Sequence, residues 1–386
     1  MNTTLINTVK SSFLNKFEAE PVLIFSPGRI NIIGEHTDYN DGFVFPAAVN
    51  KGIVAAIQKS ESAESVAFAV DKNESITFDL NNLKPSTKGS WQNYILGVIS
   101  EIQKRHHTIG NFNIAFGGDI PGGAGMSSSA ALENSVVFGL NTVFDLGLSK
   151  HDMILISQKA EHNYVGVNCG IMDQYASMFG IENHALLLDC RTVEATPFKI
   201  DFKDYELLLI NTNVKHSLSD SAYNDRRSVC ESVSELLNIK ALRDATVTDL
   251  NTVKTKITPE NYQKALFIIE ENNRAIAASK AMKADDLVTL GELIYASHDG
   301  LKNQYKVSCE ELDFLVSETK ANPNILGARM MGGGFGGCTI NLIAKSEVDT
   351  FKDHIAEAYK TKFEKECSIY EVKLSDGTHI INELKQ

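Results

Sequence analysis

The sequence predicts an α+β protein with two domains, and three patterns along the chain support that fold class. Short apolar runs separated by polar residues dominate residues 22–80, which is typical of β-strands. From about residue 230 onward, polar and helix-favouring residues predominate. The segment 338–374 then predicts a strand, a helix and a strand in succession. The chain therefore begins with a sheet-rich domain and continues with a second domain that mixes helices and strands.

The individual elements follow from the spacing of apolar residues. In the first half we expect strands over 22–25, 43–49, 53–57, 66–70, 76–80 and 112–116, and helices over 91–102, 132–144 and 153–164. The continuous apolar runs 185–188 and 207–210 indicate central strands that are buried on both faces. In the second half we expect helices over 231–239, 262–282, 310–320 and 348–363, and strands over 338–344 and 370–374. The change of pattern predicts a boundary near residue 200, with domains at 1–200 and 201–386.

The charge balance excludes one class of partner. The chain has 37 Lys and Arg against 49 Asp and Glu, a formal net charge of -12. Such a balance repels the backbone of nucleic acids, so we expect no nucleic-acid partner. Any bound phosphate must then be held locally by backbone amides, a metal ion or a few arginines.

Cysteine usage and hydropathy predict a cytoplasmic protein with no membrane partner. The 6 cysteines lie far apart and form no C-x-x-C pair, so we expect reduced thiols. The first fourteen residues lack the apolar core of a signal peptide. No run approaches the length of about 18 apolar residues that a membrane-spanning helix needs.

Residues 117–130 form a Gly- and Ser-rich segment directly before a predicted helix. Glycines let backbone amides approach an anion, and the positive end of the helix dipole points to the same place. The segment therefore suits phosphate binding, although it lacks the lysine of the usual P-loop. From composition alone, an ordinary loop that starts a helix is an equally good interpretation.

Two further segments carry side chains suited to binding and catalysis. Arg29, Glu35, His36 and Asp38 lie within ten residues, a set that suits a polyhydroxylated substrate. Taken alone, a solvated turn with incidental ion pairs is the better interpretation of that segment. Asp173 lies among apolar neighbours and can act as a general base if a nearby cation keeps it ionised. The alternative is that Asp173 caps the start of a helix.

A fourth segment, 330–338, contains three glycines that satisfy G-x-G-x-x-G: Gly332, Gly334 and Gly337. In a dinucleotide-binding fold a helix follows this motif, whereas here the alternating strand 338–344 follows. We therefore reject a dinucleotide cofactor and expect a tight loop between two lobes.

Together and in this order, the segments resemble the signature motifs of the GHMP family of small-molecule kinases. Residues 27–40 resemble the sugar-binding stretch of its galactokinases, 121–131 the ATP loop and 327–339 the third, Gly-rich motif. Residues 169–174 and Tyr223-Asn224 match as well. The resemblance implies a two-lobed architecture, with an N-terminal mixed-sheet domain that binds sugar and ATP and a C-terminal ferredoxin-like α+β domain. The active site is then expected in the cleft between them.

The resemblance also implies roles for individual residues. Asp173 resembles the catalytic base, and Arg29 the residue that stabilises the transition state. The positions that resemble the sugar contacts are Glu35, His36, Thr37, Asp38, Gly170 and Tyr223. The positions that resemble the ATP contacts are Gly123, Ala124, Gly125, Met126, Ser127, Ser128 and Ser129. Ser129 and Glu161 resemble the ligands of Mg²⁺, which takes one or two protein oxygens beside those of phosphate and water.

The implied reaction is the ATP-dependent phosphorylation of the anomeric 1-hydroxyl of D-galactose, the first committed step of galactose catabolism. ATP is then the co-substrate, Mg²⁺ the cofactor and the enzyme a monomer. Two alternatives stay open at this point: a 1-kinase for N-acetylgalactosamine or another pyranose, and a sensor that binds galactose and ATP without turnover. The intact Asp173, Arg29 and Ser129 argue against the sensor.

Overall fold

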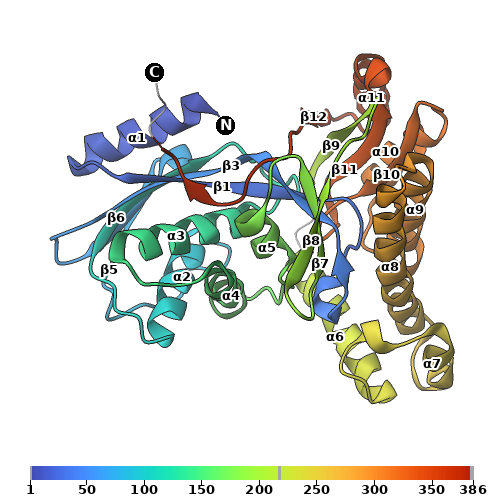
Figure 1. The fold of residues 1–386 in the computed structure, drawn as a ribbon, viewed down its shortest axis with the longest axis horizontal. Helices are drawn as coiled ribbons and strands as arrows, with labels where there is room; N and C mark the ends of the chain where they lie inside the picture. The colour runs from blue at the N-terminus through green and yellow to red at the C-terminus, as the bar shows by residue number, and fades with distance from the viewer. Residues whose placement is uncertain (1, 216–218, 383–386) are drawn as a thin grey trace.

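In the part of the chain that the structure describes, the fold comprises two domains built around three β-sheets (Figure 1). It is a computed structural model that describes residues 2–215 and 219–382. The helices are α1 (Thr3–Phe17), α2 (Gln92–Lys104), α3 (Ser128–Phe144), α4 (Lys150–Ala160), α5 (Met172–Phe179), α6 (Ser219–Leu237), α7 (Val247–Thr252), α8 (Pro259–Lys283), α9 (Leu287–Gly300), α10 (Glu310–Lys320) and α11 (Val348–Phe363). Within the described ranges, no helix is long and apolar enough to cross a membrane.

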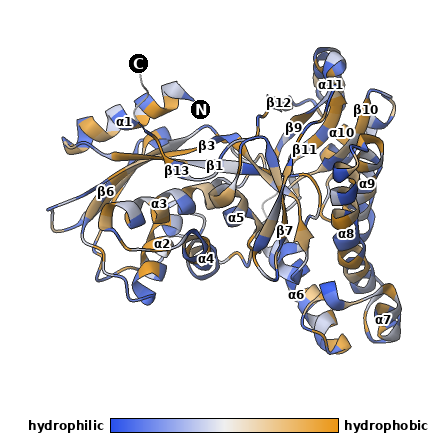
Figure 2. Ribbon diagram, in the orientation of Figure 1, coloured by the Kyte–Doolittle hydropathy of each residue, from blue (hydrophilic) through white to orange (hydrophobic). Residues whose placement is uncertain are grey.

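A six-stranded mixed sheet organises the N-terminal domain. Its strands, in spatial order, are β13 (His379–Ile380), β1 (Val22–Asn31), β3 (Pro46–Lys59), β6 (Phe112–Gly118), β4 (Ser65–Ala69) and β5 (Glu74–Phe78). Neighbours are antiparallel except β4 and β6, which are parallel. α1 covers one face of the sheet, and α2 to α5 cover the other (Figure 1). In Figure 2, α1 shows both hydrophobic and hydrophilic colours, and its buried residues are the apolar Ile6, Val9 and Phe13.

Two smaller sheets complete the molecule. β2 (Phe43–Val44), β7 (His184–Asp189) and β8 (Glu194–Lys199) form a three-stranded sheet. In the C-terminal domain, β10 (Ile325–Met330), β11 (Gly336–Ala344), β9 (Tyr205–Lys215) and β12 (Ser368–Glu371) form a four-stranded antiparallel sheet. The strands predicted from the apolar runs 185–188 and 207–210 are β7 and β9, and each is central in its sheet, as expected.

The predicted fold class is confirmed, whereas several boundaries differ. The two strands expected over 43–49 and 53–57 are largely one, β3, which continues through the polar residues 50–52. Asn50 there donates its backbone N–H to the carbonyl of Lys373 and accepts from the Lys373 N–H, so these polar groups are satisfied. The segment 332–335 leads into strand β11, which begins at Gly336, and this agrees with the rejection of a dinucleotide-binding turn.

The C-terminal end of the described chain returns to the N-terminal domain. Ile380 and His379 in β13 pair with Ile24 and Phe25 of β1. Thr378 just before β13 bonds through its hydroxyl to Ser26, at 2.9 Å. The domain boundary near residue 200 stays a prediction, and residues 379–380 belong to the N-terminal sheet.

Candidate active site

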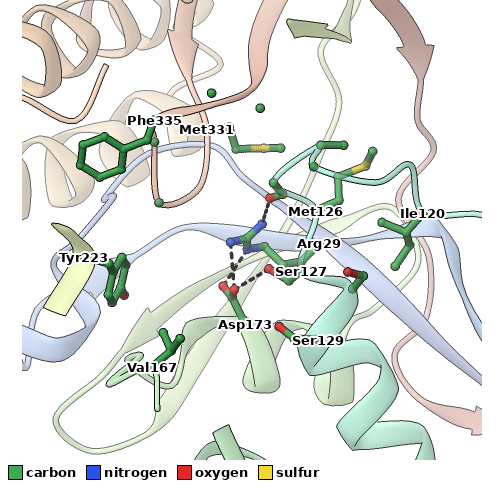
Figure 3. Close-up of a pocket in the computed structure, with 18 of the residues that line it drawn as sticks. Arg29, Ile120, Met126, Ser127, Ser129, Val167, Asp173, Tyr223, Met331 and Phe335 are labelled. Carbon is green, nitrogen blue, oxygen red and sulfur yellow. Dashed lines mark hydrogen bonds and ion pairs between the residues drawn. The ribbon is translucent and has the colours of Figure 1, made fainter. Parts of the chain in front are cut away.

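Two adjoining cavities lie where the domains meet. The larger is lined by the Gly- and Ser-rich loop 120–129 and by 333–337 of the C-terminal domain, and Figure 3 shows its interior. The smaller is lined by residues of 35–38, 169–173 and 332–333. Four residues line both: Arg29, Asp173, Tyr223 and Gly333. A molecule in one cavity and a molecule in the other can therefore meet beside Arg29 and Asp173.

Arg29 and Asp173 form a two-point ion pair at this junction (Figure 3). Arg29 Nε lies 2.8 Å from Asp173 Oδ1, and Nη2 lies 3.0 Å from Oδ2. The Arg29 side chain is almost completely buried, and its Nη1 donates to the carbonyl of Gly125. Ser127 also donates to Asp173 Oδ2. The Asp173 carboxylate is therefore held against the Arg29 guanidinium. The Asp173 side chain is still 29% exposed, and it lines both cavities.

The helix-cap interpretation of Asp173 does not hold. α5 begins at Met172, its N-cap residue is Ile171, and no side chain caps it. Asp173 is the second residue of the helix, and its oxygens are bonded to Arg29 and Ser127. The Asp173 side chain therefore lies in the cavity wall and does not cap the helix.

The start of α3 suits an anion. Its N-cap, Ser127, has a left-handed backbone (φ 57°) and makes no side-chain bond to the helix, since its hydroxyl bonds to Asp173. No side chain caps the first-turn N–H groups, which carry the positive end of the helix dipole. Gly125 (φ 67°) lies so close to Met331 that an added Cβ would lie 3.0 Å from the Met331 carbonyl oxygen. The two Gly-rich segments thus pack against each other in the lining of the larger cavity.

Glu35 is a buried carboxylate with one oxygen already engaged. Its side chain is 2% exposed, and its Oε1 accepts from Arg329 Nη2 at 3.1 Å and from the Gly332 N–H at 2.8 Å. Arg329 is itself fully buried on β10 and also donates to the carbonyls of Ile32 and Met330. Oε2 is the oxygen left for a ligand in the smaller cavity.

Asp38 and Gly170 are in close contact in the smaller cavity. Withdrawal from water, together with the charges of Asp173 and Glu35, raises the pKa of Asp38 to about 7. A Cβ at Gly170 would lie 2.0 Å from Asp38 Oδ2, so only glycine leaves room for this carboxyl group. The close contact between Gly170 and Asp38 places both residues in the same cavity wall.

The structure brings most of the predicted sugar contacts together, but not Thr37. The Thr37 hydroxyl is buried and bonds to the backbone oxygens of Gly34 and Phe43, at 2.9 and 2.7 Å. Thr37 lines neither cavity, so its role is to hold the loop. Tyr223 on α6 reaches both cavities, and its ring lies 5.3 Å from that of His36.

Ser129 and Glu161 lie together beside the larger cavity. Ser129 is in the first turn of α3, and Glu161 begins a π-helical turn, η3 (Glu161–Val165), at the end of α4. Burial and the charge of Asp173 raise the pKa of Glu161 to about 7, while bonds from Cys169, Ser129 and Gln174 oppose the shift. A buried carboxylate beside a hydroxyl and another carboxylate suits a divalent cation. Among the described residues, no cluster of three or more His, Cys, Asp or Glu side chains forms a metal site.

Sequence reasoning missed several residues that support the site from behind. Arg329 bonds Glu35, Tyr39 bonds His36, and Tyr305 bonds Tyr39. Glu133, one helical turn after Ser129, is fully buried and bonded to Gln174. A charged residue among apolar neighbours is unusual in a buried element, so the sequence around Glu133 and Arg329 could have marked them as functional. The sequence around Tyr39 and Tyr305 has no such feature.

Comparisons with known proteins agree with the site. The chain matches the galactokinase galactose-binding signature at residues 11–59, the N-terminal GHMP kinase domain at 93–181 and the C-terminal GHMP kinase domain at 278–361. It is 40% identical to a galactokinase of Thermotoga neapolitana (92% of this chain, 99% of that protein). It is also 40% identical to one of Clostridium beijerinckii (97% and 99%).

A solved structure gives a similar result. The crystal structure of Lactococcus lactis galactokinase complexed with galactose superposes with a TM-score of 0.93 at 33% identity, over 97% of this chain and 99% of that one. Mevalonate kinase of Methanococcus jannaschii shares the fold, with a TM-score of 0.66 at 17% identity over 93% of this chain and 99% of that one.

Proposed function

This chain belongs to the galactokinase family of the GHMP kinases, and we propose that its two adjoining cavities bind D-galactose and ATP. The protein is an ATP-dependent galactose kinase. The observation that carries the assignment of sites is the Arg29–Asp173 pair, which lies where the small polar cavity meets the glycine-lined one. Galactose occupies the smaller cavity, and the phosphates of ATP lie in the larger one.

Asp173 acts as the general base in this proposal. It accepts the proton of the 1-hydroxyl while the sugar oxygen bonds to the γ-phosphorus and the bond from phosphorus to the β-γ bridging oxygen breaks. ADP leaves with the electron pair of that bond, and galactose 1-phosphate forms. Arg29 supports the reaction because its guanidinium counters the charge on the transferring oxygens and holds Asp173 in place.

In this proposal, backbone N–H groups and the dipole of helix α3 hold the phosphates of ATP. Residues 123–129 present glycine and serine amides, and the uncapped start of α3 adds its positive end. This supports the expectation that a protein with a net charge of -12 binds phosphate by local groups. On the sugar side, Glu35, His36, Asp38, Gly170 and Tyr223 surround the smaller cavity.

We infer that Mg²⁺ accompanies ATP, with Ser129 Oγ and Glu161 as its protein ligands. The raised pKa of Glu161 supports this, because a carboxylate that burial disfavours is stabilised by a cation. When bound, Mg²⁺ neutralises charge on the phosphate oxygens and orients them. The monomeric state and the cytoplasmic location stay predictions.

The Asp173→Asn variant tests the assignment of the base. Asparagine keeps the size and much of the hydrogen bonding, so galactose and ATP should bind with little change. Because general-base catalysis contributes about 10² to 10⁴ in rate, kcat should fall by that factor. The measurement is ADP release with saturating galactose, ATP and Mg²⁺.

Asp152→Asn is a matched control. Asp152 lies in the first turn of α4 and forms a true capping box with Ser149, away from both cavities. Its substitution should leave kcat unchanged. A folded Asp173→Asn protein whose kcat lies within a few-fold of wild type would refute the base assignment.

Galactose, N-acetylgalactosamine, glucose and arabinose tested in parallel would define the sugar preference.

A further inference from the structure

Gln174 is a fully buried amide next to the larger cavity. It is the third residue of α5 and directly follows Asp173. Its Nε2 lies 3.0 Å from Glu161 Oε2 and 3.4 Å from Glu133 Oε2. An amide nitrogen donates hydrogen bonds and does not accept them, so the direction of both bonds is fixed. One neutral amide therefore donates to two buried carboxyl groups, one on η3 and the other on α3.

The orientation of the Gln174 amide follows from these neighbours. If the amide were reversed, its Oε1 would face both carboxyl groups, and three acceptor oxygens would meet without a donor. The residue is also held from behind, because its backbone oxygen accepts from Asn134 Nδ2 at 2.9 Å. Asn134 Oδ1 in turn accepts from the Ser157 hydroxyl at 2.9 Å. Gln174 is thus tied to α3 and α4, and its N–H groups are directed at the carboxyl groups.

The bond from Gln174 determines which oxygen of Glu161 is left for a ligand. Glu161 Oε2 also accepts from Cys169 Sγ at 3.6 Å, so both donors hold the same oxygen. Oε1 is then the oxygen left for a cation, and Glu161 lines the larger cavity together with Ser129. Hydrogen bonds from outside a metal site orient the ligands and strengthen metal binding.

Gln174 holds Glu161 without cancelling its charge. The groups bonded to Glu161 are the Gln174 amide and the side chains of Cys169 and Ser129. All three are neutral, since burial raises the pKa of Cys169 well above its usual value and keeps the thiol protonated. A lysine or arginine in place of Gln174 would neutralise the carboxylate that a cation needs. A neutral donor leaves that negative charge for Mg²⁺.

We propose that Gln174 is a positioning residue that holds the Glu161 carboxylate by Oε2, so that Oε1 is free to bind Mg²⁺ beside Ser129. The proposal rests on the assignment of Ser129 and Glu161 as Mg²⁺ ligands in the proposed function. Gln174 itself lines neither cavity, so it acts through Glu161. The short helix α5 then carries both the base, Asp173, and the residue that orients the metal ligand.

The Gln174→Met variant tests the proposal, because methionine is similar in size and has no N–H donor. Mg²⁺ affinity should fall about 10- to 100-fold, the usual effect of losing a partner of a metal ligand. Calorimetric titration of Mg²⁺ into the protein with a bound non-hydrolysable ATP analogue measures it. The kcat at saturating Mg²⁺ and the KM for galactose should change less than about threefold. A variant with wild-type Mg²⁺ affinity and a lower kcat at every Mg²⁺ concentration would overturn the proposal, since Gln174 would then only support α5.

Gln304→Met is the matched control. Gln304 Nε2 donates to the Glu270 carboxylate at 3.1 Å, and Gln304 lines neither cavity. The same substitution at the same kind of bond should leave Mg²⁺ affinity unchanged. If Gln174→Met does not fold, Gln174→Asn replaces it, because its amide is one CH₂ shorter and no longer reaches Glu161. A folded Gln174→Asn protein with wild-type Mg²⁺ affinity would also overturn the proposal.

A double variant shows whether Gln174 acts through Glu161. In the Glu161→Ala background, Gln174→Met should cause no further loss of Mg²⁺ affinity, whereas additive losses would overturn the proposal. Wild-type Mg²⁺ affinity in Glu161→Ala would overturn the metal assignment and the role of Gln174 with it. Absence of galactose turnover in the wild type would instead overturn the proposed function, and the Mg²⁺ titration would still decide the role of Gln174.

Discussion

Asp38 occupies a position that disfavours its own charge. Its pKa is raised from 3.8 to about 7 by loss of water and by Asp173 and Glu35 beside it. A carboxyl group with a raised pKa in the folded state adds stability below its unfolded pKa and loses that stability as the pH rises through the folded pKa. The stabilising contribution should therefore be complete below about pH 4 and absent above about pH 7.

Asp38→Asn should consequently stabilise the sugar-free protein at pH 8 and leave its stability unchanged at pH 4. Since one pKa unit corresponds to about 1.4 kcal/mol and the group is only partly buried, we expect a gain of roughly 1 to 3 kcal/mol. Denaturant unfolding at the two pH values measures it. The same variant should bind galactose more weakly. Equal effects at pH 4 and pH 8 would show that the charge of Asp38 is not what destabilises the fold.

How far the site could be predicted depends on what each residue contacts. Arg29, Glu35, His36 and Asp38 are chemically distinctive and close in sequence, and the cavities contain all of them. Thr37 lies in the same run but turns into the loop, because its hydroxyl is the partner that two backbone oxygens need. Sequence proximity alone does not distinguish these orientations.

At the scale of elements, two π-helical turns deliver side chains to the site. η3 (Glu161–Val165) continues α4, and η6 (Leu301–Tyr305) continues α9. π-helical turns are rare in proteins, and a large share of those that exist lie at functional sites. Glu161 lies at the start of one, and Tyr305 lies at the end of the other. Apolar spacing predicts a helix for 153–164, but it contains no signal for the wider turn.

The Glu161→Ala variant tests the role of the first π-helical turn. Loss of the carboxylate should raise the Mg²⁺ concentration for half-maximal activity at least about tenfold, as loss of a metal-site contact typically does. The KM for galactose should change little, because Glu161 does not line the smaller cavity. Titration of Mg²⁺ at fixed ATP and galactose measures the first effect, and titration of galactose at saturating Mg²⁺ and ATP measures the second.

Glu347→Ala provides the control for this titration. Glu347 is a carboxylate in the C-terminal domain that bonds to Asn322 and Asn324 and lines neither cavity. It should leave the Mg²⁺ dependence unchanged. If Glu161→Ala behaves in the same way, Glu161 is not a ligand of the metal.

At the scale of the whole molecule, the C-terminal domain holds the loop that carries the sugar contacts. Glu271 on α8 accepts the Gly34 N–H at 2.9 Å, and Asn272 accepts the Phe43 N–H at 2.9 Å. Arg329 bonds Glu35 between these two points. The loop is thus an N-terminal segment whose shape depends on the other domain.

Arg329→Met should destabilise the protein by about 3 to 5 kcal/mol, because it leaves the buried Glu35 carboxylate without its cation. Adding Glu35→Gln removes the unpaired charge, so the double variant should recover more than about 1 kcal/mol of that loss. Urea unfolding of both single variants and the double variant measures the coupling. Strictly additive effects would show that the two residues do not stabilise each other.

The general architecture could be predicted because strands and helices with strong apolar spacing dominate the chain. The helices α1, α7 and α9 were not predicted. The strands β8 and β10 were also missed, for local reasons. β8 is an edge strand interrupted by Pro197, and β10 contains Gly327 and Arg329 where alternation would place apolar residues. Their pairing is determined by neighbouring strands and not by their own pattern.

The return of residues 378–380 to the first sheet also has a consequence for synthesis on the ribosome. Thr378 bonds to Ser26 on β1 and to the Ser177 backbone on α5, the two elements that carry Arg29 and Asp173. These residues are translated after every other described element, although domains generally begin to fold from the N-terminus during synthesis. A nascent chain that still lacks these residues has only the direct contacts between β1 and α5, including the Ser26–Ser177 and Arg29–Asp173 bonds. The bridge through Thr378, which joins the elements that carry the base and its arginine, forms only after translation has passed β13.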